Sequence, residues 1–98
     1  LGDMLELGKH SKKLHSAVSS TINRTSINCV NVIGKHIVET YKNINKNKQG
    51  LILKKNSKII DLIKNNINNN DYLMIKGSNS TGLYKLANAL KAGRINAL

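Results

Sequence analysis

The sequence of 98 residues has no tryptophan, no phenylalanine and only three tyrosines, so its hydrophobic core has to be built from aliphatic side chains. It has a single cysteine, Cys29, which excludes an internal disulfide and argues against a structural zinc site. Because Cys29 lies in an apolar run, we expect a buried and unreactive thiol, in keeping with a reducing compartment. No apolar run approaches the roughly 20 residues that span a bilayer, and no signal-peptide pattern occurs, so we expect a cytoplasmic protein with no membrane contact.

Acidic residues are also scarce. The chain has five of them and sixteen lysines and arginines, which gives a net charge of +11. Such a balance is typical of proteins that bind nucleic acid. The lysines, however, are spread along the whole chain, only Arg24 and Arg94 offer a guanidinium fork, and the tyrosines show no spacing suited to stacking bases. Asparagine and isoleucine are enriched together with lysine, which is the joint bias of an AT-rich coding sequence. We therefore weigh this compositional explanation above nucleic-acid binding.

The hydrophobic pattern changes its period several times along the chain. Apolar residues that recur every three or four positions predict helices over 11–22, 35–44, 57–67 and 83–90. Short apolar runs between them predict strands over 28–33, 51–53 and 72–75, and Leu1 has the character of the last residue of a further strand. We expect a single α/β domain over residues 1–98, three-layered and Rossmann-like, with a mainly parallel sheet of about four strands flanked by helices.

The loop at 76–82 follows a predicted strand and therefore lies where ligands gather in parallel sheets. Its glycines, hydroxyl groups and Lys76 could bind a phosphate or a carboxylate. Equally, Ser80 or Thr81 could cap the next helix while Gly82 permits the turn. The loop lacks the residue order of a P-loop.

The loop at 2–8 carries two carboxylates, Asp3 and Glu6. They could bind a cation, orient a lysine or accept a hydrogen bond from a substrate amine. From the residues alone we favour the simpler interpretation that Asp3 caps a turn and Glu6 is solvated. The histidines and the cysteine have no metal-ligand spacing, and we expect a packed or capping role for His15.

In combination these motifs resemble the C-terminal domain of the Mur ligases, of the MurF type. The resemblance rests on Leu-Gly-Asp-Met-Leu-Glu-Leu-Gly at 1–8, with Ser11, Leu14 and His15 after it. It continues through Val-Ile-Gly at 32–34, Lys-Gly-Ser at 76–78 and Gly-Leu at 82–83. The motifs occur in the order of the family and cover nearly the whole chain.

The resemblance implies that the chain is one domain of a larger, three-domain cytoplasmic enzyme of peptidoglycan synthesis. Such a ligase joins D-alanyl-D-alanine to UDP-N-acetylmuramoyl-tripeptide and consumes ATP. ATP and Mg²⁺ would be bound by a central domain that these residues do not include, so this chain alone would be inactive. Its role would be to close on its ATP-binding domain, next to the UDP-sugar domain, and to help bind the dipeptide.

The resemblance also implies which residues face the cleft between the domains, with no catalytic residue and no metal ligand among them. They are Asp3, Glu6, Lys76, Gly77, Ser78 and Asn79. Asp3 would face the ATP domain, and the residues from Lys76 to Asn79 would lie near the dipeptide carboxylate. Asn79 stands where an arginine is commoner, so a guanidinium contact would be absent or replaced by Lys85. Two other classes remain open, a small basic α/β nucleic-acid-binding module and a stand-alone nucleotide-binding or signalling domain.

Overall fold

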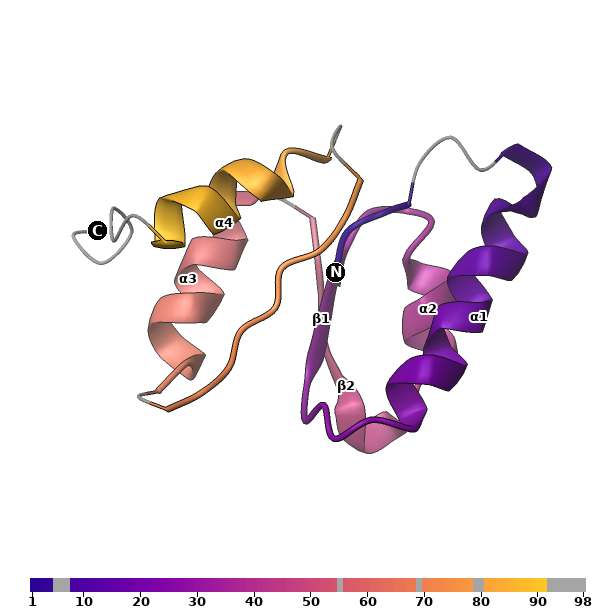
Figure 1. Cartoon of the computed structure of the whole chain (residues 1–98), viewed down its shortest axis with the longest axis horizontal. Coiled ribbons are helices and arrows are strands. Elements are labelled where there is room, and N and C mark those ends of the chain that lie inside the picture. Colours follow the sequence, from indigo (N-terminus) through magenta and orange to yellow (C-terminus); the bar gives the residue numbers. More distant parts are fainter. Residues whose placement is uncertain (5–7, 55, 69, 79–80, 92–98) are drawn as a thin grey trace.

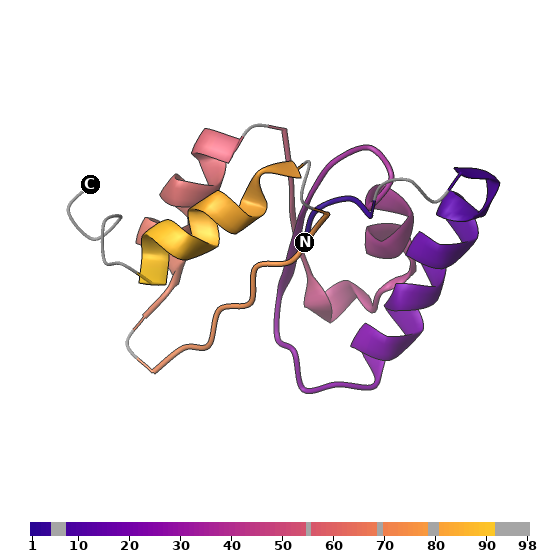
Figure 2. The same cartoon turned by 45° about the horizontal axis from the view of Figure 1, so that its top comes forward.

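The structure, a computed structural model, describes residues 1–4, 8–54, 56–68, 70–78 and 81–91, and the statements below concern these residues. They form a mixed α/β structure in which a small parallel sheet separates two groups of helices (Figure 1). Both views place two helices on each side of the sheet (Figure 2). One side holds α1 (Ser11–Asn23) and α2 (Val38–Asn43), and the other holds α3 (Asn56–Asn66) and α4 (Leu83–Lys91).

The sheet consists of two parallel strands, β1 (Val30–Ile33) and β2 (Gln49–Leu53). Their register pairs Val32 with Ile52 and shifts between Val30 and Val32. Residues 1–3 lie on the other side of β1, where a single parallel bridge joins Gly2 to Ile33. The backbone amide of Ile33 donates to the carbonyl oxygen of Leu1 over 2.9 Å, so the first residues lie beside β1 as an incipient strand.

The prediction of a four-stranded, Rossmann-like sheet is wrong, because the described residues form a two-stranded sheet instead. Residues 72–75, predicted as a strand, are outside any strand, and the side chains of Tyr72 and Met74 are 103% and 72% exposed. A strand that is apolar on both faces needs cover on both. The neighbouring segment is the start of the chain, where Gly2 and Asp3 form backbone hydrogen bonds. These bonds reach residues 76–78, which follow the predicted strand, and not residues 72–75. Residues 72–75 therefore have no ladder partner among the described residues.

The helices agree better with the sequence pattern. α1, α3 and α4 occupy the predicted segments to within one or two residues at most ends. α2 is shorter than the predicted 35–44, because residues 35–37 form a turn before the helix begins at Val38. A 3₁₀ helix, Gly8–His10, leads into α1, and another, Lys46–Lys48, leads into β2. Helical periodicity depends on local sequence, which explains this agreement.

The core is small and aliphatic, as the lack of large aromatic residues predicts. Its buried members come from α1, from β1 and from both ends of α2, and they are Ile22, Val30, Val32, Ile37 and Ile44. The expectation of a buried Cys29 is wrong, since its side chain is exposed. Cys29 ends the exposed segment 24–29 and precedes the first buried residue of β1, which explains its exposure. Within the described ranges, every helix is too short or too polar to cross a membrane.

Candidate functional site

The two loops singled out by the sequence meet at one edge of the sheet. The backbone amide of Gly2 donates to the carbonyl oxygen of Lys76 over 2.8 Å, and that of Ser78 donates to the carbonyl oxygen of Asp3 over 2.9 Å. A Cβ atom on Gly77 would lie only 3.2 Å from the Cα atom of Gly2. Glycine at position 77 thus lets the two backbones approach each other, while the absence of a side chain on Gly2 leaves room for Leu83. The structure brings four of the six predicted cleft residues together, whereas Glu6 and Asn79 lie outside the described residues.

The carboxylate of Asp3 points into the protein and caps the turn before α2. Its Oδ1 atom accepts hydrogen bonds from the backbone amides of His36, over 3.0 Å, and Ile37, over 2.7 Å. The residue is only 8% exposed. A carboxylate bonded to two amides at the start of a helix is a strong, charge-assisted cap. The interpretation that Asp3 caps a turn is therefore confirmed, and the turn lies more than thirty residues further along the chain.

Gly34 makes room for this carboxylate. Its φ angle is +127°, in the region that L side chains rarely adopt. A Cβ atom built on Gly34 would overlap the carboxylate group of Asp3. The glycine after β1 thus has two tasks, because it turns the chain sharply and leaves space for the capping group.

His15 holds the same loop from the side of α1. The residue is fully buried, and its Nε2 atom accepts a hydrogen bond from the backbone amide of Met4 over 3.0 Å. Its Nδ1 atom lies 2.8 Å from the carbonyl oxygen of Ser11. Since an amide can only donate, Nε2 is the acceptor, and we assign the ring proton to Nδ1 on this pattern. The expected packed role of His15 is confirmed, and both ring nitrogens are occupied by the protein itself.

The end of the second loop caps α4. Thr81 Oγ1 accepts a hydrogen bond from the backbone amide of Leu83 over 3.3 Å and donates one to the carbonyl oxygen of Ser78 over 2.6 Å. Gly82 between them has a φ angle of +77°. The alternative in which Thr81 caps the helix and Gly82 permits the turn is therefore observed. Because Thr81 caps the helix, the described residues of this loop that remain candidates for binding an anion are residues 76–78.

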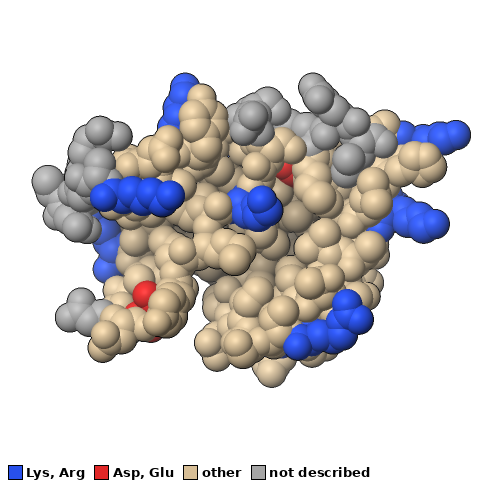
Figure 3. All heavy atoms as spheres, in the orientation of Figure 1, with Lys and Arg blue, Asp and Glu red and all other residues tan. Residues whose placement is uncertain are grey.

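The charge at this edge comes from Lys76, whose side chain is exposed while its carbonyl oxygen is bonded to Gly2. On the face seen in Figure 3, lysine and arginine side chains project over both halves of the molecule, and few acidic side chains reach the surface. An anion that approaches residues 76–78 would therefore meet an exposed ammonium group on a rigidly held loop.

Replacing Asp3 by alanine should lower the free energy of unfolding by about 2–3 kcal/mol, because two backbone amides lose their acceptor. Asp3→Asn keeps an oxygen acceptor without the charge, so we expect a loss of about 1 kcal/mol. Asp61→Asn on α3, where the side chain is exposed, is the matched control and should change stability by less than about 0.5 kcal/mol. Urea denaturation followed by circular dichroism measures all three. Equal stabilities of Asp3→Ala and Asp61→Asn would contradict the capping role.

Gly34→Ala should destabilise by at least about 3 kcal/mol, because it adds backbone strain and displaces the Asp3 carboxylate. Gly8 has a φ angle of +57° with nothing within 4 Å of its Cβ position, so Gly8→Ala isolates the strain and should cost about 1 kcal/mol. In the double variant Asp3→Ala, Gly34→Ala we expect a loss smaller than the sum of the single losses, since both remove the same contact. Additive losses would show that Gly34 and the carboxylate act independently.

Comparisons of the chain with protein-family models, with curated proteins and with solved structures find no match. The resemblance to the Mur ligases thus rests on the sequence motifs, and the function that it implies is a proposal.

Proposed function

We propose that the chain is the C-terminal domain of a cytoplasmic, ATP-dependent ligase that adds D-alanyl-D-alanine to UDP-N-acetylmuramoyl-tripeptide in peptidoglycan synthesis. One observation above the others supports the proposal. The two motifs that carry the resemblance, at 1–8 and 76–78, are far apart in the sequence, yet residues 2–3 and 76–78 are joined by two backbone hydrogen bonds. Loops that are distant in the sequence and meet in the fold commonly contribute to one binding surface.

A carboxylate is a poor electrophile and has to be activated before an amine can attack it. In such a ligase, the central domain would bind ATP and Mg²⁺ and so provide for conversion of the tripeptide carboxylate into an acyl phosphate. No three histidine, cysteine, aspartate or glutamate side chains within the described ranges lie close enough to hold a metal ion. We therefore assign no step in this chain to a metal. The contribution of these residues is binding, orientation and exclusion of water.

Lys76 is the residue that we assign to the substrate. Its exposed ammonium group would pair with the terminal carboxylate of D-alanyl-D-alanine and so direct the amine of the dipeptide towards the acyl phosphate. The backbone of its loop is held by hydrogen bonds to Gly2 and Asp3, so the fold sets the point from which the Lys76 side chain extends. Closure of this edge on the central domain would keep water from the acyl phosphate.

Asp3 acts as a positioning residue in this proposal. Its carboxylate is bonded to the turn before α2, while its carbonyl oxygen accepts from the amide of Ser78. Loss of the cap would therefore move the loop that carries Lys76. Dipeptide binding would then be weaker because Lys76 is displaced, and not because Asp3 itself contacts the dipeptide.

A chimaera tests the proposal directly. In a MurF-type ligase of known activity, this chain replaces the C-terminal domain, and release of phosphate is measured with ATP, UDP-N-acetylmuramoyl-tripeptide and D-alanyl-D-alanine. We expect phosphate release that depends on the dipeptide. Lys76→Gln in the chimaera should raise the KM for the dipeptide by about tenfold, as the loss of one charge pair of about 1.4 kcal/mol predicts, without changing the KM for ATP.

Lys58→Gln on α3 removes the same charge from an exposed position away from this edge and is the matched control. It should leave the KM for the dipeptide unchanged. A chimaera that folds and binds ATP but releases no phosphate when the dipeptide is added would refute the proposed function. Equal effects of Lys76→Gln and Lys58→Gln would refute the role of Lys76 alone.

A further inference from the structure

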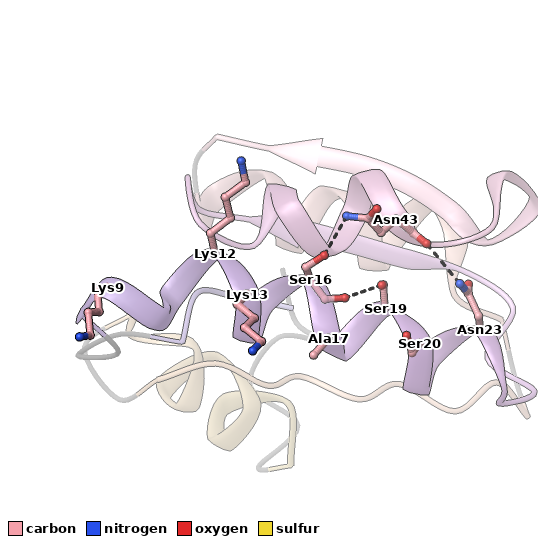
Figure 4. A pocket seen from close by; sticks show the side chains of 9 residues that line it. All are labelled: Lys9, Lys12, Lys13, Ser16, Ala17, Ser19, Ser20, Asn23 and Asn43. Atoms are coloured by element: carbon pink, nitrogen blue, oxygen red, sulfur yellow. Dashed lines mark hydrogen bonds between the residues drawn. The ribbon is translucent and has the colours of Figure 1, made fainter.

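The outer face of α1 carries a shallow depression that the proposed ligase function does not use. Its volume is about 790 Å³, and it is lined mainly by lysine, serine and asparagine side chains. Figure 4 shows Lys9, Lys12 and Lys13 at one end of the helix and Asn23 with Asn43 at the other. The amide of Asn43 donates to Ser16 Oγ over 3.2 Å and so links α2 to this face.

The polar residues of this face follow one stripe of the helix. They are Lys9 in the preceding 3₁₀ helix and Lys12, Lys13, Ser16, Ser19, Ser20 and Asn23 in α1, which stand at positions i, i+3, i+4, i+7, i+10, i+11 and i+14. At a rise of 1.5 Å per residue, the stripe is about 21 Å long. Lys9, Lys12 and Lys13 are already close in the sequence, and the fold places them at one end of this polar track.

No acidic residue balances this charge nearby in the chain. Residues 7–38 contain no aspartate or glutamate, and within the described part of the chain no acidic side chain forms an ion pair with Lys9, Lys12 or Lys13. Two of these lysines occupy the first turn of α1, where a positive charge opposes the helix dipole. Lys12 and Lys13 thus reduce the stability of the free helix, and a bound anion would reverse this effect.

The chemistry of the track indicates which anion it fits. Ammonium groups are usual partners of phosphate oxygens in nucleic acids. On this face the three lysines supply them, since the amides of Asn23 and Asn43 and the hydroxyl of Ser19 donate to other groups of the protein. The lining has no aromatic side chain on which an unpaired base could stack, and Ala17 is its sole apolar residue, so neither single-strand stacking nor insertion into a lipid surface is favoured. The length of the track suits a polymer rather than a single phosphate group. We propose that the outer face of α1 binds the sugar–phosphate backbone of a nucleic-acid duplex, without reading its base sequence.

Fluorescence anisotropy with a labelled 20-base-pair DNA duplex tests this proposal. With three phosphate contacts, the logarithm of the binding constant should fall with the logarithm of the salt concentration with a slope of about −2.7, which is about 40-fold between 50 and 200 mM salt. The triple variant Lys9→Gln, Lys12→Gln, Lys13→Gln should bind at least about tenfold more weakly at 50 mM salt and lose most of this slope. Its helix should persist, and its thermal midpoint should rise by a few degrees, because charges that oppose the helix dipole are removed.

The matched control is Lys54→Gln, Lys58→Gln, Lys64→Gln, which removes three exposed lysines at or next to α3 and gives the same net charge. It should keep affinity and slope within about twofold of the parent chain. Equal weakening in both triple variants would show attraction by net charge alone and overturn the proposal. Undetectable binding of the duplex at 50 mM salt would also overturn the proposal. The same holds if poly-glutamate or anionic vesicles bind as tightly as the duplex and with the same dependence on Lys9, Lys12 and Lys13. The outcome is independent of the ligase chimaera, since Lys76 takes no part.

Discussion

One interaction organises this structure: a single oxygen of the Asp3 carboxylate accepts hydrogen bonds from the backbone amides of His36 and Ile37. It fixes the first residues of the chain to the turn between β1 and α2. Because the carboxylate is buried and its bonds are charge-assisted, it holds this junction more firmly than ordinary surface contacts could. The neighbours of Asp3 extend the junction, since Gly2 bonds to the loop before α4 and Met4 bonds to His15 on α1. Three consecutive residues therefore join three distant parts of the sequence.

The helices and the two parallel strands β1 and β2 were predicted from the sequence, whereas the predicted third strand and the four-stranded sheet were not found among the described residues, for a physical reason. The apolar face of α1 follows from the spacing of residues within thirteen positions, so local sequence determines it. A strand, by contrast, exists only where a neighbour offers hydrogen bonds. The run at 72–75 has the composition of a buried strand, yet no neighbour of matching length lies beside it among the described residues, and Tyr72 remains fully exposed. The end of α2 nearest Asp3 was also predicted too early, because the capped turn occupies residues 35–37.

The candidate site was predictable in position but not in detail. Asp3 and Lys76–Ser78 lie together as expected, although residues 72–75, whose predicted strand was the reason for this expectation, form no strand. The direction of the Asp3 carboxylate depends on a contact with residues more than thirty positions away, which no local pattern records. The signal that could have revealed the partner is Gly34, a glycine directly after a strand. The polar track on α1 was missed because the lysines were judged over the whole chain, although Lys9, Lys12 and Lys13 lie within five residues.

Residues 2–4 join the two sides of the molecule as one cooperative unit if the contacts described above act together. Native-state hydrogen exchange of the backbone amides tests it most directly. In the unmodified chain, the amides of Met4, Ile37 and Ser78 should exchange with similar opening free energies, and in Asp3→Ala all three should lose protection together. The amide of Ile67, which donates to the carbonyl oxygen of Ile63 at the end of α3, should keep its protection in this variant. Unchanged protection of Ser78 in Asp3→Ala, or an unprotected Ile37 in the parent chain, would contradict the account.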